Sequence, residues 1–253
     1  MTKKSRLEIL HADSSLVVVN KPAGLLSIPD RYDQSLPSVK SAVREQFGSA
    51  YVVHRLDRET SGVMLMPLTP EAHRALSEQF EHHTVTKTYE AIVSGIVDRD
   101  EMTIDIPIAP DSRRKGLMKP SAKGKEARTV LRVLERFRLA THVECDLITG
   151  RQHQIRVHCS AIGHPLLVDE DYGTSSAFLL SSIKRRYNVR KGETERPIIE
   201  RLTLHSKRIS FNHPDTAERM TIEAPPPKDF SATLQVLRKY AAPYASTFDA
   251  EFF

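Results

Sequence analysis

The apolar positions of this chain fall into short runs with two spacings. Residues 7–10, apolar except for Glu8, and the apolar run 16–19 lie on either side of a turn at 12–15 (Ala-Asp-Ser-Ser), which predicts two strands. Residues 63–66 form an uninterrupted apolar run, which predicts a buried strand. Alternation and β-branched residues predict further strands over residues 88–93, 102–106, 126–137, 142–148, 202–211 and 220–222.

Helical spacing recurs in four other segments. The first is 36–47, with Pro37 near its first turn, and the second begins at Pro70 after Thr69 as an N-cap. The third is 152–162, closed by Gly163. Asp229 is predicted to cap the last helix, whose apolar face would be formed by Phe230, Leu234, Leu237 and Tyr240.

The order of these elements indicates the fold class. Strands outnumber helices and do not alternate strictly with them, which favours an α+β fold on a mainly antiparallel sheet with flanking helices over a doubly wound one. The 253 residues contain no internal repeat and no low-complexity linker. We therefore expect one domain over 1–253, with its core at about 7–241 and a loose tail at 242–253.

Charge changes this picture at one place. Lys and Arg exceed Asp and Glu by 37 to 32, a modest net charge of +5. The predicted loop 111–125 contains one acidic residue and six basic residues, which include Arg113, Arg114 and Lys115.

No apolar run is long enough to span a membrane, and the basic start lacks the apolar stretch of an export signal. Cys145 and Cys159 are expected to be reduced thiols of a cytoplasmic protein.

The segment 54–62 contains the most unusual chemistry. Asp57 lies between Arg55 and Arg58 and is followed by Thr60-Ser61-Gly62. In extended backbone Arg55 and Asp57 share a face, and a nearby guanidinium favours an ionised carboxylate, which suits a nucleophile. The competing interpretation is an aspartate that accepts hydrogen bonds from backbone donors in a turn. The segment alone leaves both open.

Two further segments carry candidate functional side chains. Lys87-Thr88-Tyr89 places an aromatic hydroxyl at the start of a strand, and residues 149–158 place a glycine before a helix that bears Arg151 and Arg156. A metal site formed by His153, His158, His164 and Cys159 lacks standard zinc spacing, so we expect no metal. The sequence also lacks the glycine-rich motifs of nucleotide cofactor binding.

Taken together, these motifs resemble the RluA-type pseudouridine synthases, enzymes that isomerise uridine to pseudouridine in ribosomal or transfer RNA. The resembling segments keep their order and spacing across most of the chain. They are 21–24 (Lys-Pro-Ala-Gly), 54–62, 87–89, 150–158, 163–165 with Asp169 and Tyr172-Gly173, and 202–205 (Leu-Thr-Leu-His).

The resemblance implies specific roles for four residues. Asp57 would be the catalytic aspartate, Tyr89 the aromatic residue that lies against the target uracil and helps move its C5 proton, and Arg156 the partner of Asp57. Leu204 would be an apolar contact near the uracil, although a plain core leucine fits equally well. The resemblance also implies a two-lobed domain, an active-site cleft across the sheet, and no cofactor or metal.

An RNA substrate would require cationic contacts, because turning a uridine out of its stack costs a few kcal/mol. The phosphate-binding candidates are Arg55, Arg58, Arg151, Arg113, Arg114 and Lys115. We expect a monomer acting on transfer RNA or large-subunit ribosomal RNA, without a membrane or nucleotide cofactor. Two alternatives remain: an RNA-binding protein without catalysis, and a hydrolase that pairs Asp57 with Glu59.

The chain also departs from the family pattern. Val168 and Ser206 stand where the family usually has Gly and Ala, and we expect neither to touch the catalytic trio. About six residues precede the first strand, so RNA capture is expected to depend on the catalytic domain or a partner. The segment 174–201 is long, and we expect it to add an RNA contact through Lys184, Arg185, Arg186, Arg190 and Lys191.

Overall fold

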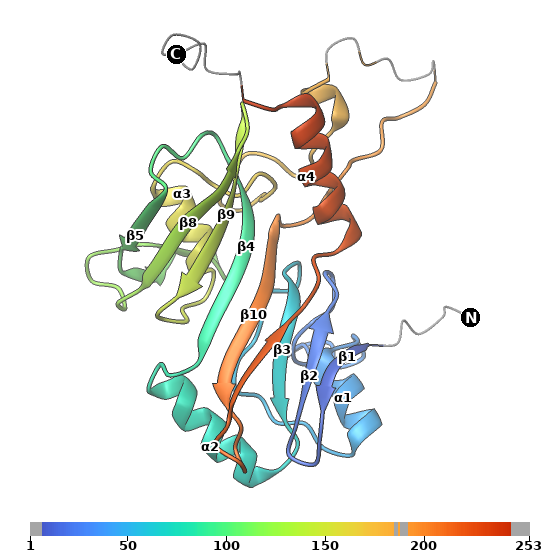
Figure 1. The fold of residues 1–253 in the computed structure, drawn as a ribbon, viewed down its shortest axis with the longest axis vertical. Coiled ribbons are helices and arrows are strands. Elements are labelled where there is room, and N and C mark those ends of the chain that lie inside the picture. The colour runs from blue at the N-terminus through green and yellow to red at the C-terminus, as the bar shows by residue number, and fades with distance from the viewer. Residues whose placement is uncertain (1–6, 185–186, 188–191, 244–253) are drawn as a thin grey trace, which may run out of the picture.

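The computed structural model describes residues 7–184, 187 and 192–243. Their framework is a nine-stranded sheet in the order β1-β2-β3-β10-β4-β9-β8-β5, with β11 on β10 (Figure 1). Among the described strands, β3 and β10 are the one parallel pair, so the predicted mainly antiparallel α+β fold is confirmed. The strands of this sheet are β1 Glu8–Ala12, β2 Leu16–Lys21, β3 Ser61–Pro67, β4 Thr86–Ser94, β5 Glu101–Asp105, β8 Arg128–Arg136, β9 Ala140–Leu147, β10 Leu204–Asn212 and β11 Arg219–Glu223.

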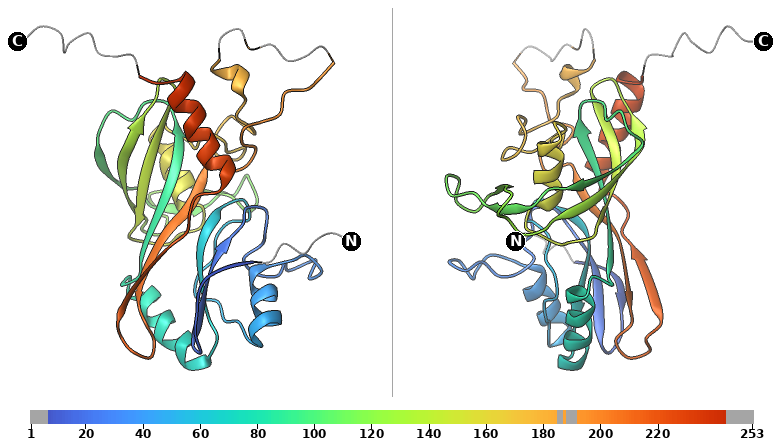
Figure 2. Two further views of the ribbon diagram at one scale, coloured as in Figure 1. Left: turned by 45° about the vertical axis from the view of Figure 1, so that its right-hand side comes forward. Right: turned by 90° about the vertical axis from the view of Figure 1, so that its left-hand side faces the viewer.

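Helices cover both faces of this sheet. The helices are α1 Val39–Phe47, α2 Pro70–Glu81, α3 Gln154–Ala161 and α4 Lys228–Tyr240, with a short 3-10 turn at Leu180–Ser182. Side chains of α1 and α3 share one apolar cluster with Met64 and Ala91 of the sheet. Leu76 of α2 packs with Val63 and Leu65, which point to the other side of β3. In the right-hand view of Figure 2, α1 and α3 lie on the same side of the sheet and α4 on the other.

The central strands are buried on both faces, which explains their uninterrupted apolar runs. In β2, Val17 and Val19 join the cluster under α1 and α3, whereas Leu16 and Val18 join the cluster on the opposite face. Within the described residues, no helix combines the length and the apolar character needed to cross a bilayer.

The helix boundaries differ from the predicted ones for local reasons. The first helix begins at Val39 rather than at residue 36, because the Ser38 hydroxyl caps it and Pro37 disfavours helical backbone at the preceding residue. The third begins at Gln154 rather than at 152, because His153 adopts left-handed backbone with φ 54°. The prediction that Asp229 caps α4 is wrong. Asp229 lies in the first turn of this helix, where its carboxylate binds Arg201.

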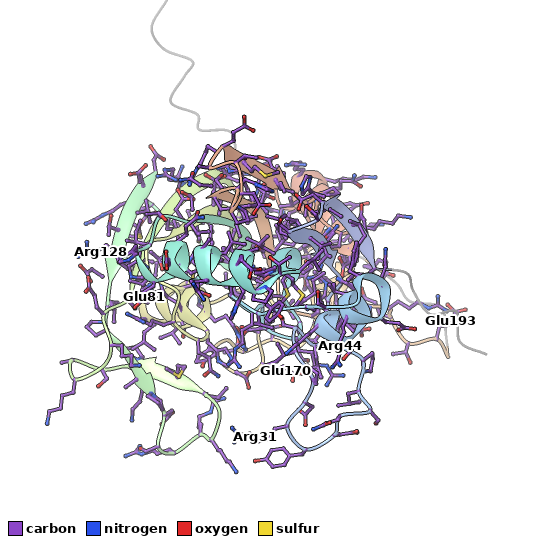
Figure 3. All side chains as sticks on the ribbon, turned by 90° about the horizontal axis from the view of Figure 1, so that it is seen from below. Arg31, Arg44, Glu81, Arg128, Glu170 and Glu193 are labelled. Carbon is purple, nitrogen blue, oxygen red and sulfur yellow. The ribbon has the colours of Figure 1, made fainter. Side chains whose placement is uncertain are left out.

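The predicted basic loop 111–125 is not entirely a loop. Residues Met118–Pro120 form β7, which pairs with β6, Ile108–Pro110, in a separate two-stranded sheet. This basic hairpin, residues 108–125, projects from the side of the large sheet that bears α1 and α3 (Figure 2, right). Seen from below in Figure 3, it reaches out beside the loop that carries Arg31. The expected loose tail falls mainly on residues 244–253, which lie outside the described residues.

Gly62 allows the close approach of β3 and β10. Its φ is +116°, and a Cβ atom there would lie 2.1 Å from the backbone oxygen of Ser206. We expect Gly62→Ala to lower the free energy of unfolding by more than about 2 kcal/mol, measured by urea denaturation. The matched control is Gly48→Ala, because Gly48 has φ +84° and open space around it. Equal losses in the two variants would show that backbone strain, not the close approach, is the cause.

Candidate active site

Asp57 is positioned by the irregular segment that leads into β3. Leu56 is buried in the core, and its backbone N–H and carbonyl are both bonded to the Ser27 hydroxyl, at 3.0 and 2.6 Å. The chain then turns, with the Thr60 N–H donating to the Asp57 carbonyl at 3.1 Å. These bonds hold the segment so that the Asp57 side chain, 27% exposed, faces an open pocket, whereas the Leu56 side chain packs in the core.

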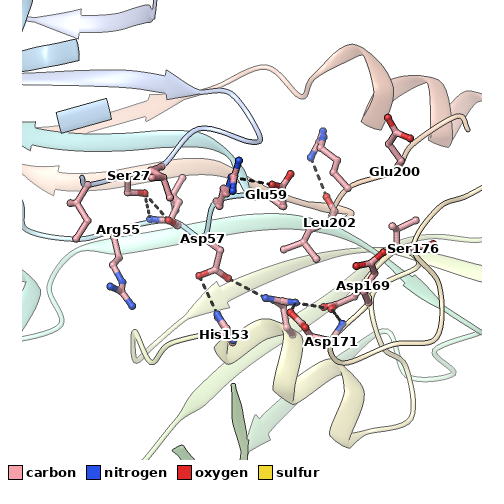
Figure 4. Close-up of a pocket in the computed structure, with 18 residues that line it drawn as sticks. Ser27, Arg55, Asp57, Glu59, His153, Asp169, Asp171, Ser176, Glu200 and Leu202 are labelled. Carbon is pink, nitrogen blue, oxygen red and sulfur yellow. Dashed lines mark hydrogen bonds and ion pairs between the residues drawn. The ribbon is translucent and has the colours of Figure 1, made fainter. Parts of the chain in front are cut away.

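Two cationic or polar side chains from α3 and its N-terminus face the Asp57 carboxylate. His153 Nε2 lies 3.7 Å from Oδ1, and a terminal nitrogen of Arg156 lies 3.8 Å from Oδ2 (Figure 4). Both separations exceed ordinary hydrogen-bond length. Within the described part of the chain the carboxylate therefore forms no short side-chain hydrogen bond, and its oxygens remain open to the pocket.

Arg58 follows Asp57 in the sequence but, within the described part of the chain, forms no ion pair or hydrogen bond with its carboxylate. The turn after Asp57 directs Arg58 towards the loop that follows β2, where its Nε donates to the Gly24 carbonyl at 3.1 Å. Its nearest acidic partner is Glu59, at 3.7 Å on the surface. Arg55 lines the same pockets as Asp57 and, within the described part of the chain, forms no ion pair with it.

Arg156 is held mainly by an acid other than Asp57. Its guanidinium donates two hydrogen bonds of 2.7 Å to Asp169 and one of 2.8 Å to Asp171. It also lies over the Tyr172 ring, 4.7 Å from the centroid. Burial opposes the charge, but the hydrogen bonds and charge of Asp169 outweigh it and raise the pKa of Arg156. Arg156 is thus a fixed cation beside Asp57.

His153 is held in one orientation by Tyr172. The Met118 N–H donates to the Tyr172 hydroxyl at 2.7 Å, which leaves the hydroxyl hydrogen for His153 Nδ1 at 2.8 Å. The ring hydrogen of His153 is then on Nε2, the atom that faces Asp57. Burial lowers the pKa of His153, which keeps the ring neutral near pH 7. A backbone group of the basic hairpin is thereby linked to the carboxylate through two side chains.

Tyr89 lies on β4 and lines a pocket together with Leu204. Burial raises the pKa of its phenol to about 12, despite a hydrogen bond with the Ser206 side chain, so the group is protonated at neutral pH. The expectation that Ser206 touches none of the three residues is wrong, because the register of β4 and β10 places Ser206 opposite Tyr89. The Ser206 hydroxyl also donates to the Val63 carbonyl at 3.2 Å.

The site consists of two adjoining pockets that meet at Asp57. Both are lined by Arg55, Leu56, Asp57, His153 and Arg156. The first pocket, drawn in Figure 4, is lined by more acidic than basic side chains. The acidic ones include Glu59, Asp169, Asp171 and Glu200, and Arg58 and Arg201 also line it. The second pocket contains Tyr89 and Leu204 and has cationic walls that include Lys87 and Arg151. The expected cleft across the sheet is therefore present, and its two ends differ in charge.

The predicted RNA-binding residues are distributed around this cleft. Arg151 lines the second pocket, and its Nε donates to the Glu126 carbonyl at 2.8 Å. Arg113 and Lys115 are exposed at the tip of the basic hairpin. Arg114 reaches back and donates to the backbone oxygen of Asp171 at 2.7 Å. Of the basic residues expected to bind RNA in 174–201, Lys184 lies over the Tyr240 ring, and Arg185, Arg186, Arg190 and Lys191 lie outside the described residues.

The histidines considered for a metal site have other partners. His158 is buried, with Nδ1 at 2.9 Å from the Thr129 hydroxyl and Nε2 at 3.0 Å from the Ile106 carbonyl. His164 Nδ1 lies 3.0 Å from the Ser94 carbonyl. Among the described residues, no three His, Cys, Asp or Glu side chains gather so that they could hold a metal ion.

Sequence reasoning assigned no role to several residues that the structure brings to the site. Asp169 and Tyr172 belong to a recognised segment, and their spacing after α3 was the available signal. Lys87 belongs to the motif Lys87-Thr88-Tyr89, but the sequence analysis gave it no role. Nothing in the local sequence connects Ser206 with Tyr89, since their contact depends on the pairing of two strands more than 100 residues apart.

Comparisons with known proteins point to one family. The family model of RNA pseudouridylate synthase matches residues 15–161. The dual-specificity RNA pseudouridine synthase RluA of Pasteurella multocida (strain Pm70) is 37% identical over 222 residues, which cover 87% of this chain and 93% of that protein. The ribosomal large subunit pseudouridine synthase D of Pseudomonas aeruginosa (strain PAO1) is 38% identical over 243 residues, covering 92% and 72%.

A solved structure of a human protein has a similar fold. Human RNA pseudouridylate synthase domain containing 4 superposes with a TM-score of 0.69 at 27% identity, covering 91% of this chain and 93% of that one. The relatives and the fold favour the isomerase over a carboxylate-pair hydrolase or an inactive RNA-binding protein. On this evidence the chain belongs to the RNA pseudouridylate synthase family, whose members are isomerases that act on RNA.

Proposed function

We propose that Asp57 is the carboxylate with which this chain converts a uridine of structured RNA into pseudouridine, with Tyr89 and Arg156 as its partners. One observation carries the proposal: side chains from three distant segments line one pocket. Asp57 lies 3.8 Å from Arg156, and both line the second pocket together with Tyr89. Perturbed and partly buried ionisable groups in a cleft are typical of catalytic sites.

The reaction needs no added atom. The bond between C1′ and N1 of the nucleotide breaks, the uracil turns, and a bond forms between C1′ and C5. The hydrogen on C5 leaves and N1 gains one, so the product is an isomer. Asp57 would act as nucleophile or base, and Arg156 would supply a fixed positive charge beside it. Tyr89 would lie against the uracil and help move the C5 proton, starting as a protonated phenol.

The RNA would be recognised at the cationic parts of the cleft. A stacked uridine is out of reach of Asp57, so the target nucleotide must turn outward, and phosphate contacts offset that cost. Arg55, Arg151 and the exposed residues Arg113 and Lys115 of the basic hairpin are suited to such contacts. Arg114 would act indirectly, because it is bonded to Asp171. Arg58, which donates to Gly24, is the weaker candidate of this set.

We propose transfer RNA or large-subunit ribosomal RNA as the substrate, which agrees with the names of the relatives. The chain would act in the cytoplasm as a monomer and as one catalytic domain, an organisation that the continuous sheet supports. The test is to map pseudouridines in total RNA from cells with and without this protein. A position that loses pseudouridine, and regains it on complementation, identifies the substrate. An unchanged map would contradict the proposal.

His153 is expected to position Asp57 rather than to react. We expect His153→Gln to reduce the single-turnover rate by roughly 10- to 100-fold with little change in RNA affinity, because small displacements of a reacting group have effects of this size. Tyr172→Phe should have a smaller effect, since it frees the His153 tautomer but keeps the ring that lies under Arg156. A loss of RNA affinity equal to the loss of rate would instead assign His153 to binding.

A further inference from the structure

Lys87 is a cation in the second pocket that the proposed chemistry does not use. It lies on β4 two residues before Tyr89, so the two side chains leave the strand on the same face. Its side chain is half-buried, with the ammonium 5.8 Å from the centre of the Phe80 ring. The pocket that it lines also contains Asp57 and Leu204.

Within the described part of the chain, no acceptor compensates the charge of Lys87. The pocket wall carries the carboxylates Asp57 and Glu81, and neither forms an ion pair with it. Burial, and then the charge of Arg151, lower its pKa. An ammonium that is withdrawn from water without a partner is unfavourable, so the free protein tolerates a cost that an anionic ligand would remove.

Two other inward-facing lysines, Lys21 and Lys207, have polar partners for their ammonium groups. The fully buried Lys21 donates to three backbone carbonyls, those of Pro22, Leu25 and Arg58, at 2.7 to 3.0 Å. Lys207 lies 2.6 Å from the carboxylate of Glu90. The lack of a partner at Lys87 is therefore particular to the pocket and not a general property of lysines in this fold.

The surroundings of Lys87 leave room for an anion. Gly150 lies beside it, and a Cβ atom on that residue would be 3.3 Å from Nζ, so the glycine keeps the ammonium uncovered. Arg151 lines the same pocket and uses its Nε for the Glu126 carbonyl. Among the described residues its two terminal nitrogens have no hydrogen-bond or ionic partner, so they can bind a ligand. Two cations on one wall, next to the proposed uridine site, suit the phosphate on either side of that nucleotide.

We propose that Lys87 and Arg151 bind a phosphodiester of the target nucleotide and so anchor the everted uridine over Asp57. The inference rests on the proposed function and deepens it. The phosphate would replace the water lost by the ammonium, and its negative charge would compensate both side chains. Lys87 would thus contribute to RNA binding and orientation and would not touch the reacting atoms.

The experiment uses the full chain and an oligoribonucleotide that carries the mapped target uridine. Binding is measured in the Asp57→Asn background, so that no turnover occurs, with Lys87→Met added. The affinity is expected to fall by about 10- to 100-fold, and the slope of log K against log salt to fall by about 0.7. Lys87→Arg should restore most of the affinity. The control Lys239→Met, on α4 on the opposite side of the sheet, should leave affinity and slope unchanged.

A second oligoribonucleotide identifies the phosphate. It carries an uncharged methylphosphonate in place of one of the two phosphodiesters that flank the target uridine, and each of the two positions is tested in turn. At one position the neutral linkage should weaken RNA binding by the Asp57→Asn protein that retains Lys87. It should not weaken RNA binding by the protein that also carries Lys87→Met. Equal weakening of both forms at both positions, or an unchanged salt slope, would overturn the proposal.

Two further measurements, stability in urea and pseudouridine formation, separate effects on folding from effects on function. Lys87→Met is expected to be as stable as the parent chain in urea, or more stable, because it removes a half-buried cation that has no partner. A loss of stability would assign Lys87 a structural role and overturn the inference. Pseudouridine formation by the unsubstituted chain is assayed on the same RNA. That product can form whether or not Lys87 binds phosphate, so the proposed function and this inference fail separately.

Discussion

Asp57→Asn is expected to abolish pseudouridine formation, with a fall in rate of roughly 10⁴-fold or more, while RNA affinity stays within about twofold. The substitution removes the charge and nucleophilicity of the carboxylate but keeps its size. The Asp57 oxygens lie 3.7 Å or more from His153 and Arg156, so no short hydrogen bond is lost. Single-turnover assays measure the rate, and filter binding of the same RNA measures the affinity.

The matched control for this prediction is Glu59→Gln. Glu59 is the next carboxylate along the chain, 45% exposed, with Arg58 at 3.7 Å as its ionic neighbour. We expect nearly full activity, since surface pairs of this kind contribute little. A comparable loss of activity in both variants would support a mechanism in which Asp57 and Glu59 act as a carboxylate pair. A parallel fall of RNA binding and activity in Asp57→Asn would show that Asp57 is structural.

Asp169→Ala is expected to remove both stability and activity. The Asp169 side chain is fully buried, and it accepts two bonds from Arg156 as well as the backbone N–H groups of Asp171 and Tyr172. Removing one member of a buried ion pair leaves the other charge buried, at a cost of roughly 3–5 kcal/mol. Arg156 would then lose its orientation beside Asp57. Urea denaturation measures the first effect and single-turnover kinetics the second.

Asp171→Asn separates these two effects. Asp171 is 42% exposed and accepts one bond from Arg156, so its loss should lower the free energy of unfolding by about 1 kcal/mol or less. Because Asp169 still holds the guanidinium, most of the activity should remain. If Asp171→Asn proved as damaging as Asp169→Ala, then Asp171 would be the principal anchor of Arg156.

The two-pocket arrangement suggests how the cleft divides its tasks. Asp57 faces both pockets, and the cationic second pocket also contains Tyr89. The basic hairpin contacts the site through Met118 to Tyr172, through Arg114 to Asp171, and through the Gly116 carbonyl, which accepts a hydrogen bond from the Gln152 side chain. The hairpin is therefore bonded to two of the residues that hold His153 and Arg156.

Much of the fold followed from local patterns in the sequence. Residues 16–19 and 63–66 are strands buried on both faces, and an uninterrupted apolar run is the signature of such strands. Thr69 and Pro70 predicted the start of α2, because capping depends on neighbours within one helical turn. Asp57, Tyr89 and Arg156 were proposed together because their motifs resemble one family in order and spacing.

The tertiary structure decided which side chains meet. Sequence alone could not show that Arg156 binds Asp169 more closely than Asp57, or that Arg58 turns towards Gly24. Nor could it show that no carboxylate in the described part of the chain pairs with Lys87. Strand pairing, ion pairs and burial join residues far apart in the chain, and their energies depend on distance and solvent exclusion. Neither quantity is encoded in the spacing of residues along a single segment, whereas helix caps and strand alternation are.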